Sequence, residues 1–158
     1  RAIPQPAPLA ERSAGGAPLS LAEWHHHIRR GCADQPTPGF LHAISREGNQ
    51  LLDSSLLSGS DRKQVEQILQ VIKPPEAFFW STHGGAEIDL FFILRGRRYG
   101  MECKFNEAPK ITKSALVSVE TLKLDRLWLI YPGKHHYPVN EKITVWPLKD
   151  IATLKDQM

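Results

Sequence analysis

The sequence predicts an α/β fold in which helices flank one mixed β-sheet. Three features predict it: apolar residues with helical spacing before residue 73, two strand-forming runs on either side of a glycine turn, and an unbroken apolar run at residues 127–131. A tight turn makes its two strands antiparallel, whereas a helical connection between neighbouring strands makes them parallel. The expected order is therefore helix, three strands, helix, strand and strand.

A flexible or partly helical N-terminal segment is expected over residues 1–38. It opens with a stretch rich in Pro, Ala and Gly that lacks apolar periodicity, although residues 19–30 have the pattern of a short helix. The three adjacent histidines, His25 to His27, point in different directions on a helix, so we do not expect them to form a metal site. Residues 39–158 suffice for one folded domain, which we expect to open with one or two short helices over residues 40–57.

The first core helix is expected over residues 61–72. Its apolar residues recur at i, i+3, i+4 and i+7 and share one face: Val65, Ile68, Leu69 and Ile72. Asp61 lies four residues before the first of them, on the same line. Capping of the helix by Asp61 or Ser60 is one interpretation of these residues, since both types commonly cap helices.

A β-hairpin is expected next. Residues 87–94 and 99–105 are rich in strand formers, and Gly96 supplies the positive φ that a short turn requires. One face of this hairpin is expected to be wholly apolar, with Ile88, Leu90, Phe92 and Leu94 beside Met101, Cys103 and Phe105. Both sides of the first strand are largely apolar, so a charged group on it is costly to bury unless it is paired or binds a metal.

Three charged residues on the hairpin form a candidate site: Asp89 on the first strand, and Glu102 and Lys104 on the second. A two-residue turn at 95–96 sets Asp89 opposite Glu102, and a four-residue loop sets it opposite Lys104. Both arrangements put the three side chains on one face. A three-residue loop pairs Asp89 with Cys103 and separates them, so the site requires an even-numbered loop.

The candidate site has the chemistry of a metal-dependent phosphodiesterase. Two carboxylates about 5 Å apart disfavour each other's ionisation unless a cation lies between them. Mg²⁺ or Mn²⁺ prefers oxygen ligands and also binds phosphate oxygens, which makes Asp89 and Glu102 candidate ligands. Lys104 can orient the attacking water or neutralise charge on the phosphate. The alternative is a solvated strand face with a cross-strand ion pair.

The remaining elements complete the fold. Thr112 is expected to cap a helix over residues 112–124, with an apolar face of Ala115, Leu116, Val119 and Leu122. The apolar run at residues 127–131 is typical of a central strand that is buried on both faces. A short last strand is expected over residues 143–146.

Basic residues are placed where they could contact nucleic acid. The formal net charge is only +3, which is compatible with such a partner and does not require it. Arg95, Arg97 and Arg98 lie at the expected hairpin tip, and Lys110 and Lys113 follow the candidate site. Either these side chains contact phosphates, or the arginines simply keep the turn solvated.

The sequence offers no sign of a membrane or secreted protein. No segment has the roughly 18 apolar residues of a membrane span, and no signal-peptide pattern opens the chain. The two cysteines, Cys32 and Cys103, make no disulfide framework. We therefore expect a cytoplasmic location without membrane partners.

Four segments resemble a known family: residues 79–90, 100–104, 108–113 and 124–133. They look like the C-terminal domain, of unknown function, of a group of prokaryotic AAA-type ATPases that is related to the PD-(D/E)XK nuclease-like superfamily. The resemblance covers roughly residues 39–148. It departs from the family pattern before the first strand, where Ser60 and Lys63 stand in place of two aromatic residues.

The resemblance implies a restriction-endonuclease-like αβββαβ core. It also implies that Asp89, Glu102 and Lys104 are catalytic, that a divalent metal binds Asp89 and Glu102, and that Asp61 completes the metal site. An ATPase domain, on missing sequence or another chain, becomes an expected partner. This chain, which starts at Arg1 and is expected to be a fragment, contains no phosphate-binding-loop motif, so we expect no ATP site in it.

The expected function is that of a divalent-metal-dependent nuclease-like domain that hydrolyses or binds DNA. The alternative is a catalytically inactive module of the same fold that binds nucleic acid or docks onto an AAA-type ATPase.

Overall fold

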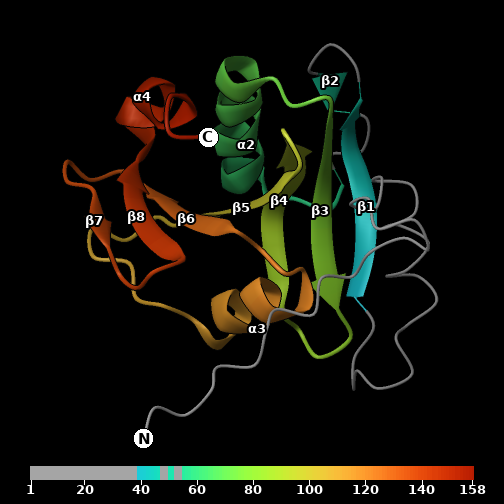
Figure 1. Cartoon of the computed structure of the whole chain (residues 1–158). Coiled ribbons are helices and arrows are strands. Elements are labelled where there is room, and N and C mark those ends of the chain that lie inside the picture. The colour runs from blue at the N-terminus through green and yellow to red at the C-terminus, as the bar shows by residue number, and fades with distance from the viewer. Residues whose placement is uncertain (1–38, 47–49, 52–54) are drawn as a thin grey trace, which may run out of the picture.

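The computed structural model describes residues 39–46, 50–51 and 55–158, so the expected N-terminal segment, with His25–His27 and Cys32, lies outside the described residues. Within them, eight strands form one mixed sheet in the order β2-β1-β3-β4-β5-β6-β8-β7 (Figure 1). The strands are β1 (Gly39–Arg46), β2 (Gln50–Leu51), β3 (Glu76–Thr82), β4 (Glu87–Leu94), β5 (Arg97–Cys103), β6 (Arg126–Tyr131), β7 (Tyr137–Pro138) and β8 (Ile143–Pro147). The helices are α2 (Gly59–Ile72), α3 (Lys113–Thr121), the 3-10 helix η1 (Leu148–Asp150) and α4 (Ile151–Lys155).

Helices cover both faces of the sheet. Figure 1 shows α2 and α4 on one face and α3 on the other. Two buried apolar clusters follow this division. The first joins the inner sides of α2 and α4 to residues such as Leu90, Met101 and Cys103. The second joins α3 to residues such as Ile88, Phe91 and Leu129. The mixed α/β class predicted from the sequence is confirmed.

The sheet is antiparallel from β2 to β5 and parallel from β5 to β8, and β7 pairs antiparallel with β8 at the far edge. Strands β1, β3, β4 and β5 pair antiparallel, and β6 runs parallel to both β5 and β8. The connection from β5 to β6 passes through α3, as the predicted helical crossover requires. The order helix, three strands, helix, strand runs from α2 to β6, and the predicted central strand is buried at residues 127–131.

The helices predicted over residues 40–57 are wrong. Residues 39–46 form β1, which pairs along the whole length of β3, and residues 50–51 form β2. A short apolar run has no periodicity that separates a helix from a strand. Here the exposed edge of β3 decides the outcome, because pairing satisfies its backbone groups and buries Leu41 and Ile44 on opposite faces of the sheet.

The predicted apolar stripe of α2 is confirmed, since its four residues are all buried. The helix begins earlier than predicted, at Gly59. Its N-cap is Ser58, whose hydroxyl accepts a hydrogen bond from the Asp61 N–H at 3.4 Å and donates one to the Asp61 carboxylate. Asp61 therefore takes part in the cap as the partner of Ser58, and neither Asp61 nor Ser60 is the N-cap residue itself.

Two expectations about the later elements are corrected. Thr112 does cap α3, accepting from the Ala115 N–H at 3.1 Å. However, Leu116 is 48% exposed and lines an open groove with Val119 and residues 140–143, so it is not part of the core face. Phe105 is 50% exposed, because β5 ends at Cys103 and the chain leaves the sheet there. None of the described helices is long and apolar enough to cross a membrane.

Candidate active site

The turn between β4 and β5 has two residues, as the site requires. Arg95 and Gly96 both have positive φ, at 53° and 77°, which is the signature of a type I′ turn. Leu94 consequently pairs with Arg97, and the register continues to the pair of Leu90 and Met101. This pairing ends one position before Asp89 and Glu102. Beyond it the two strands separate, and we call this opening the fork.

A β-bulge lies at Asp89. Between β3 and β4, Phe78 pairs with Phe91 and Trp80 with Ile88, so two steps along β3 match three along β4. Ile88 and Phe91 therefore share the α3 face, and the predicted alternation that put Ile88 beside Leu90 is wrong. The extra residue frees Asp89 from regular alternation, which lets its side chain turn into the fork.

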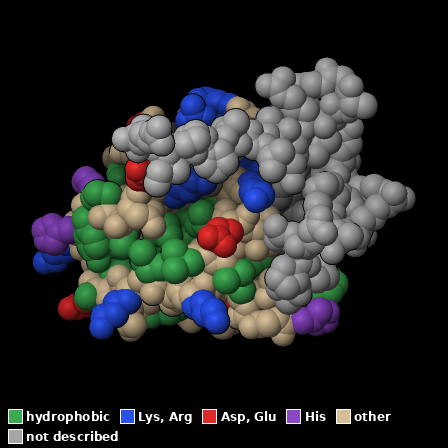
Figure 2. Space-filling view, turned by 60° about the horizontal axis from the view of Figure 1, so that its bottom comes forward, with side chains coloured by type: hydrophobic (Ala, Val, Ile, Leu, Met, Phe, Trp, Pro, Cys, Tyr) green, Lys and Arg blue, Asp and Glu red, His purple; other side chains and the backbone are tan. Residues whose placement is uncertain are grey.

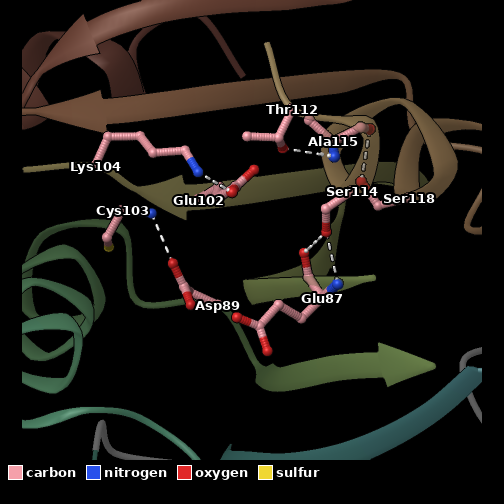
Figure 3. Close-up of polar contacts among 9 residues, drawn as sticks. All are labelled: Glu87, Asp89, Glu102, Cys103, Lys104, Thr112, Ser114, Ala115 and Ser118. Atoms are coloured by element: carbon pink, nitrogen blue, oxygen red, sulfur yellow. Dashed lines mark hydrogen bonds and ion pairs between the residues drawn. The ribbon is translucent and has the colours of Figure 1, made fainter. Parts of the chain in front are cut away.

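The Asp89 carboxylate is buried in the fork, where its Oδ2 accepts a hydrogen bond from the Cys103 N–H at 2.7 Å (Figure 3). The pKa of Asp89 is raised to about 7, chiefly by burial; the negative charges of Asp61, Glu102 and Glu87 add to the rise, and the hydrogen bond from Cys103 opposes it. Burial also raises the pKa of the Cys103 thiol well above its ordinary value. The neighbouring thiol therefore stays protonated and is no candidate nucleophile.

Glu102 and Lys104 form an ion pair at the end of β5, between Lys104 Nζ and Glu102 Oε1. The second carboxylate oxygen, Glu102 Oε2, is buried and has no hydrogen-bond partner within the described part of the chain. Burial raises the pKa of Glu102, and Lys104 opposes that rise by its hydrogen bond and its charge. Lys104 is anchored by its backbone N–H, which donates to the Ile130 carbonyl at 2.7 Å.

These residues fit a divalent cation. Two buried carboxylates with raised pKa values, one of them with an orphaned oxygen, lose stability when both ionise without a cation nearby. Their oxygen atoms are the ligands that Mg²⁺ and Mn²⁺ prefer. Across residues 39–46, 50–51 and 55–158, however, no group of three His, Cys, Asp or Glu side chains is gathered closely enough to hold a metal ion. The described site thus offers two carboxylates and needs further ligands from water or substrate.

Two residues near the site were missed by sequence reasoning. Glu87 begins β4, and its charge raises the pKa values of both Asp89 and Glu102, so its carboxylate lies within electrostatic reach of the pair. The i, i+2 spacing from Asp89 could have identified it. Ser114 bonds the backbone of Glu87, and Figure 3 shows it reaching across from α3 to β4. No local sequence signal points to that contact, because the two residues are 27 positions apart.

The other predicted site residues are divided between two regions. The carboxylate of Asp61 is engaged by Ser58, and its charge reaches Asp89. Lys113 begins α3 next to Ser114, and Lys110 lies in the preceding loop; both are exposed. The hairpin-tip arginines lie away from the carboxylates: Arg95 is in the turn, and Arg97 and Arg98 begin β5, roughly 13–17 Å along the strand from Glu102 at about 3.3 Å per residue.

The family follows from comparison with known proteins. Residues 65–151, more than half of the chain, match the family described as "Domain of unknown function (DUF4143)". The chain belongs to this family. Two curated relatives are the uncharacterized proteins Mb2031c of Mycobacterium bovis and Rv2008c of Mycobacterium tuberculosis. Each is 35% identical over 89 residues, which are 56% of this chain and 20% of the relative. The match thus spans about one fifth of each relative's length.

The part of the chain that matches DUF4143 includes the fork and its three charged residues, Asp89, Glu102 and Lys104. Asp61 precedes the matched range. The DUF4143 region also contains α3 and the whole parallel half of the sheet. Figure 2 shows the molecule from the side of α3, where exposed apolar side chains gather with acidic side chains among them and basic side chains around them.

The raised pKa of Asp89 predicts a pH-dependent stability for this DUF4143 domain. Between its ordinary pKa of 3.8 and its folded pKa of about 7, the folded state keeps a proton that the unfolded state releases. The stabilisation of the folded state by this retained proton is fully present below the pKa of the unfolded state and is lost as the pH rises through the pKa of the folded state. The unfolding free energy of the wild type should fall by on the order of 2–4 kcal/mol between about pH 4 and pH 8, and this fall should be absent in Asp89→Asn.

Urea denaturation of both proteins at several pH values in that range, without divalent metal, measures the difference. The asparagine retains an oxygen that can accept from the Cys103 N–H, so the comparison isolates the ionisation. Parallel stability curves for the two proteins would contradict a protonated Asp89 in the folded state.

Proposed function

We propose that this chain is a divalent-metal-dependent nuclease-like domain that acts on DNA phosphodiesters. In this proposal, α2, β3, β4, β5, α3 and β6 correspond to the αβββαβ core of the restriction-endonuclease-like fold. The support for the fold is the element order with its parallel β5–β6 pair, together with the resemblance of the hairpin to the PD-(D/E)XK pattern.

One observation carries the functional proposal. Asp89 and Glu102 are both buried at the end of a hairpin beside a lysine, and Glu102 Oε2 has no partner among the described residues. An unpaired buried carboxylate oxygen is destabilising, so its retention favours a ligand over a structural role. A divalent cation held by Asp89 and Glu102 would supply positive charge that stabilises the phosphate during hydrolysis.

The chain's own residues have separate roles in this proposal. Asp89 is held by the Cys103 N–H, which fixes one carboxylate oxygen and leaves the other available. Lys104 keeps Glu102 oriented through their ion pair and provides a positive charge next to the fork, where it can donate a hydrogen bond to a phosphate oxygen. Lys113 and Lys110 extend the basic character beyond the site and would contact neighbouring phosphates.

A second candidate is an inactive module of the same fold that binds nucleic acid or docks onto an AAA-type ATPase. The absence, within the described residues, of a third metal-binding side chain near Asp89 and Glu102 favours this alternative. So does the small share of the relatives that is matched, because the rest of each relative leaves room for another domain.

Cleavage of plasmid and single-stranded DNA tests the two candidates. Wild-type protein is incubated with Mg²⁺, Mn²⁺ or EDTA, alongside Asp89→Ala. Metal-dependent cutting that Asp89→Ala abolishes would support the nuclease. If no metal supports cutting and both proteins bind DNA equally weakly, the proposal fails and the inactive module is left.

A further inference from the structure

A single side chain on α3 holds the start of β4. The Ser114 Oγ accepts a hydrogen bond from the Glu87 N–H at 2.7 Å and donates one to the Glu87 carbonyl at 3.0 Å. Both backbone groups of one residue are thus satisfied by one hydroxyl from another element. Figure 3 shows Ser114 at the first turn of α3, between the Thr112 cap and the strand.

This contact acts on the segment that carries the site. Glu87 precedes Asp89 by two residues, and the bulge at Asp89 interrupts the pairing of β4 with β3. The pairing of β4 with β5 ends at Leu90, so Asp89 lies beyond the regular ladder on that side too. Pairing with β3 resumes beyond the bulge, where Trp80 is opposite Ile88 and Ser81 is opposite Glu87. The start of β4 is therefore supported by β3 on one edge, and the edge that β5 has left needs another support if the Asp89 carboxylate is to stay in the fork. Ser114 is in place to supply one.

We propose that Ser114 is a positioning residue that holds Asp89 in the fork by fixing the backbone of Glu87. This inference rests on the proposed function, because the position of Asp89 matters for activity only if Asp89 belongs to the metal site. Ser114 itself contacts neither substrate nor metal in this arrangement. Its hydroxyl acts through the strand, as groups that orient the ligands of a metal do in other proteins.

A neighbouring serine provides a matched control. Ser118 lies on the same helix and is fully buried, and its hydroxyl donates to the Ala115 carbonyl at 2.8 Å within α3. Ser118→Ala therefore removes a hydroxyl from α3 without touching β4. Ser114→Thr keeps a hydroxyl at position 114 and serves as the conservative variant.

Amide hydrogen exchange, followed by NMR, tests the positioning directly. The Cys103 N–H reports the bond to Asp89, and the Leu129 amide in β6 is the internal reference for global stability. We expect Ser114→Ala to speed exchange at Cys103 roughly 5- to 10-fold relative to that reference, because support for one hydrogen-bonded group is lost. Ser118→Ala should change both amides alike, and Ser114→Thr should restore the slow rate.

The same variants are then titrated with Mn²⁺ by calorimetry, where Ser114→Ala should bind about 10- to 100-fold more weakly. The inference is overturned if exchange at Cys103 in Ser114→Ala rises no more than exchange at Leu129. It is also overturned if the wild type binds Mn²⁺ and Ser114→Ala binds it with the same affinity. If the wild type neither binds Mn²⁺ nor cuts DNA, the nuclease proposal fails, while a selective rise at Cys103 still supports the positioning role.

Discussion

Replacing Lys104 with alanine is expected to slow metal-dependent DNA cleavage by about 10²- to 10³-fold and to leave metal binding in place. The ammonium group of Lys104 is the only positive charge paired with the candidate carboxylates in the described residues, and its partner is Glu102. Removing one such electrostatic group from an enzyme site typically lowers kcat by about 10²- to 10³-fold. Initial rates of plasmid nicking at saturating Mn²⁺ measure the loss.

The carboxylates that would hold the ion are untouched by this change. Because Lys104 lowers the pKa of Glu102, its removal raises that pKa further, so proton competition at the carboxylate increases. Assays near pH 8 keep this effect small. Lys134→Ala, which removes an exposed lysine from the loop after β6, is the matched control and should cut normally. A Lys104→Ala protein that cuts at the wild-type rate would exclude a catalytic role for this lysine.

Local sequence patterns predicted the parts of the fold that depend on interactions between residues close to each other in the sequence. The α2 stripe, the Thr112 cap and the turn at Arg95–Gly96 depend on residues within one turn or one hairpin of each other. The central strand β6 followed from an apolar run with no polar face. The stripe, the cap and the central strand were predicted from periodicity and capping chemistry and are observed. For the turn, the sequence required an even-numbered loop and left two or four residues open, and two residues are observed.

What the sequence did not reveal depends on distant partners. Strand β1 forms because an edge of β3 is available to it, and its own residues do not distinguish a strand from a helix. The bulge at Asp89 is defined by the pairing of β4 with β3, and the sequence did not reveal how these two strands pair. Of the two registers that an even-numbered loop left open, the structure has the one with a two-residue turn, and its pairing runs as far as Leu90. The sequence did not show that Asp89 turns into the fork.

Sequence order also gave a poor prediction of where the basic residues lie relative to the carboxylates. Sequence order puts the hairpin-tip arginines close to the carboxylates, but the extended strands carry them to the far end of β5. Lys113, eleven residues after Glu102, begins the helix whose Ser114 bonds the start of β4.

Replacing Glu102 with alanine is expected to remove both metal binding and cleavage, in contrast to Lys104→Ala. The change deletes one of the two buried carboxylates and its orphaned Oε2. A loss of about 4 kcal/mol of charge stabilisation corresponds to a rate decrease on the order of 10³-fold. In thermal melts, Mn²⁺ at 100 times its Kd should stabilise the wild type by about 2.7 kcal/mol and the variant not at all.

The pKa of Asp89 supplies a separate check on the Glu102 variant. The negative charge of Glu102 is one of the causes that raise this pKa, so its deletion should lower the pKa of Asp89, as carboxyl NMR titration can measure. Glu120→Ala removes an exposed carboxylate from α3 and is the control for loss of charge alone. Full stabilisation of Glu102→Ala by Mn²⁺ would show that the ion binds elsewhere. The two carboxylates in the fork would then be a buried acidic pair whose stability depends on protonation, and the nuclease proposal would lose its metal site.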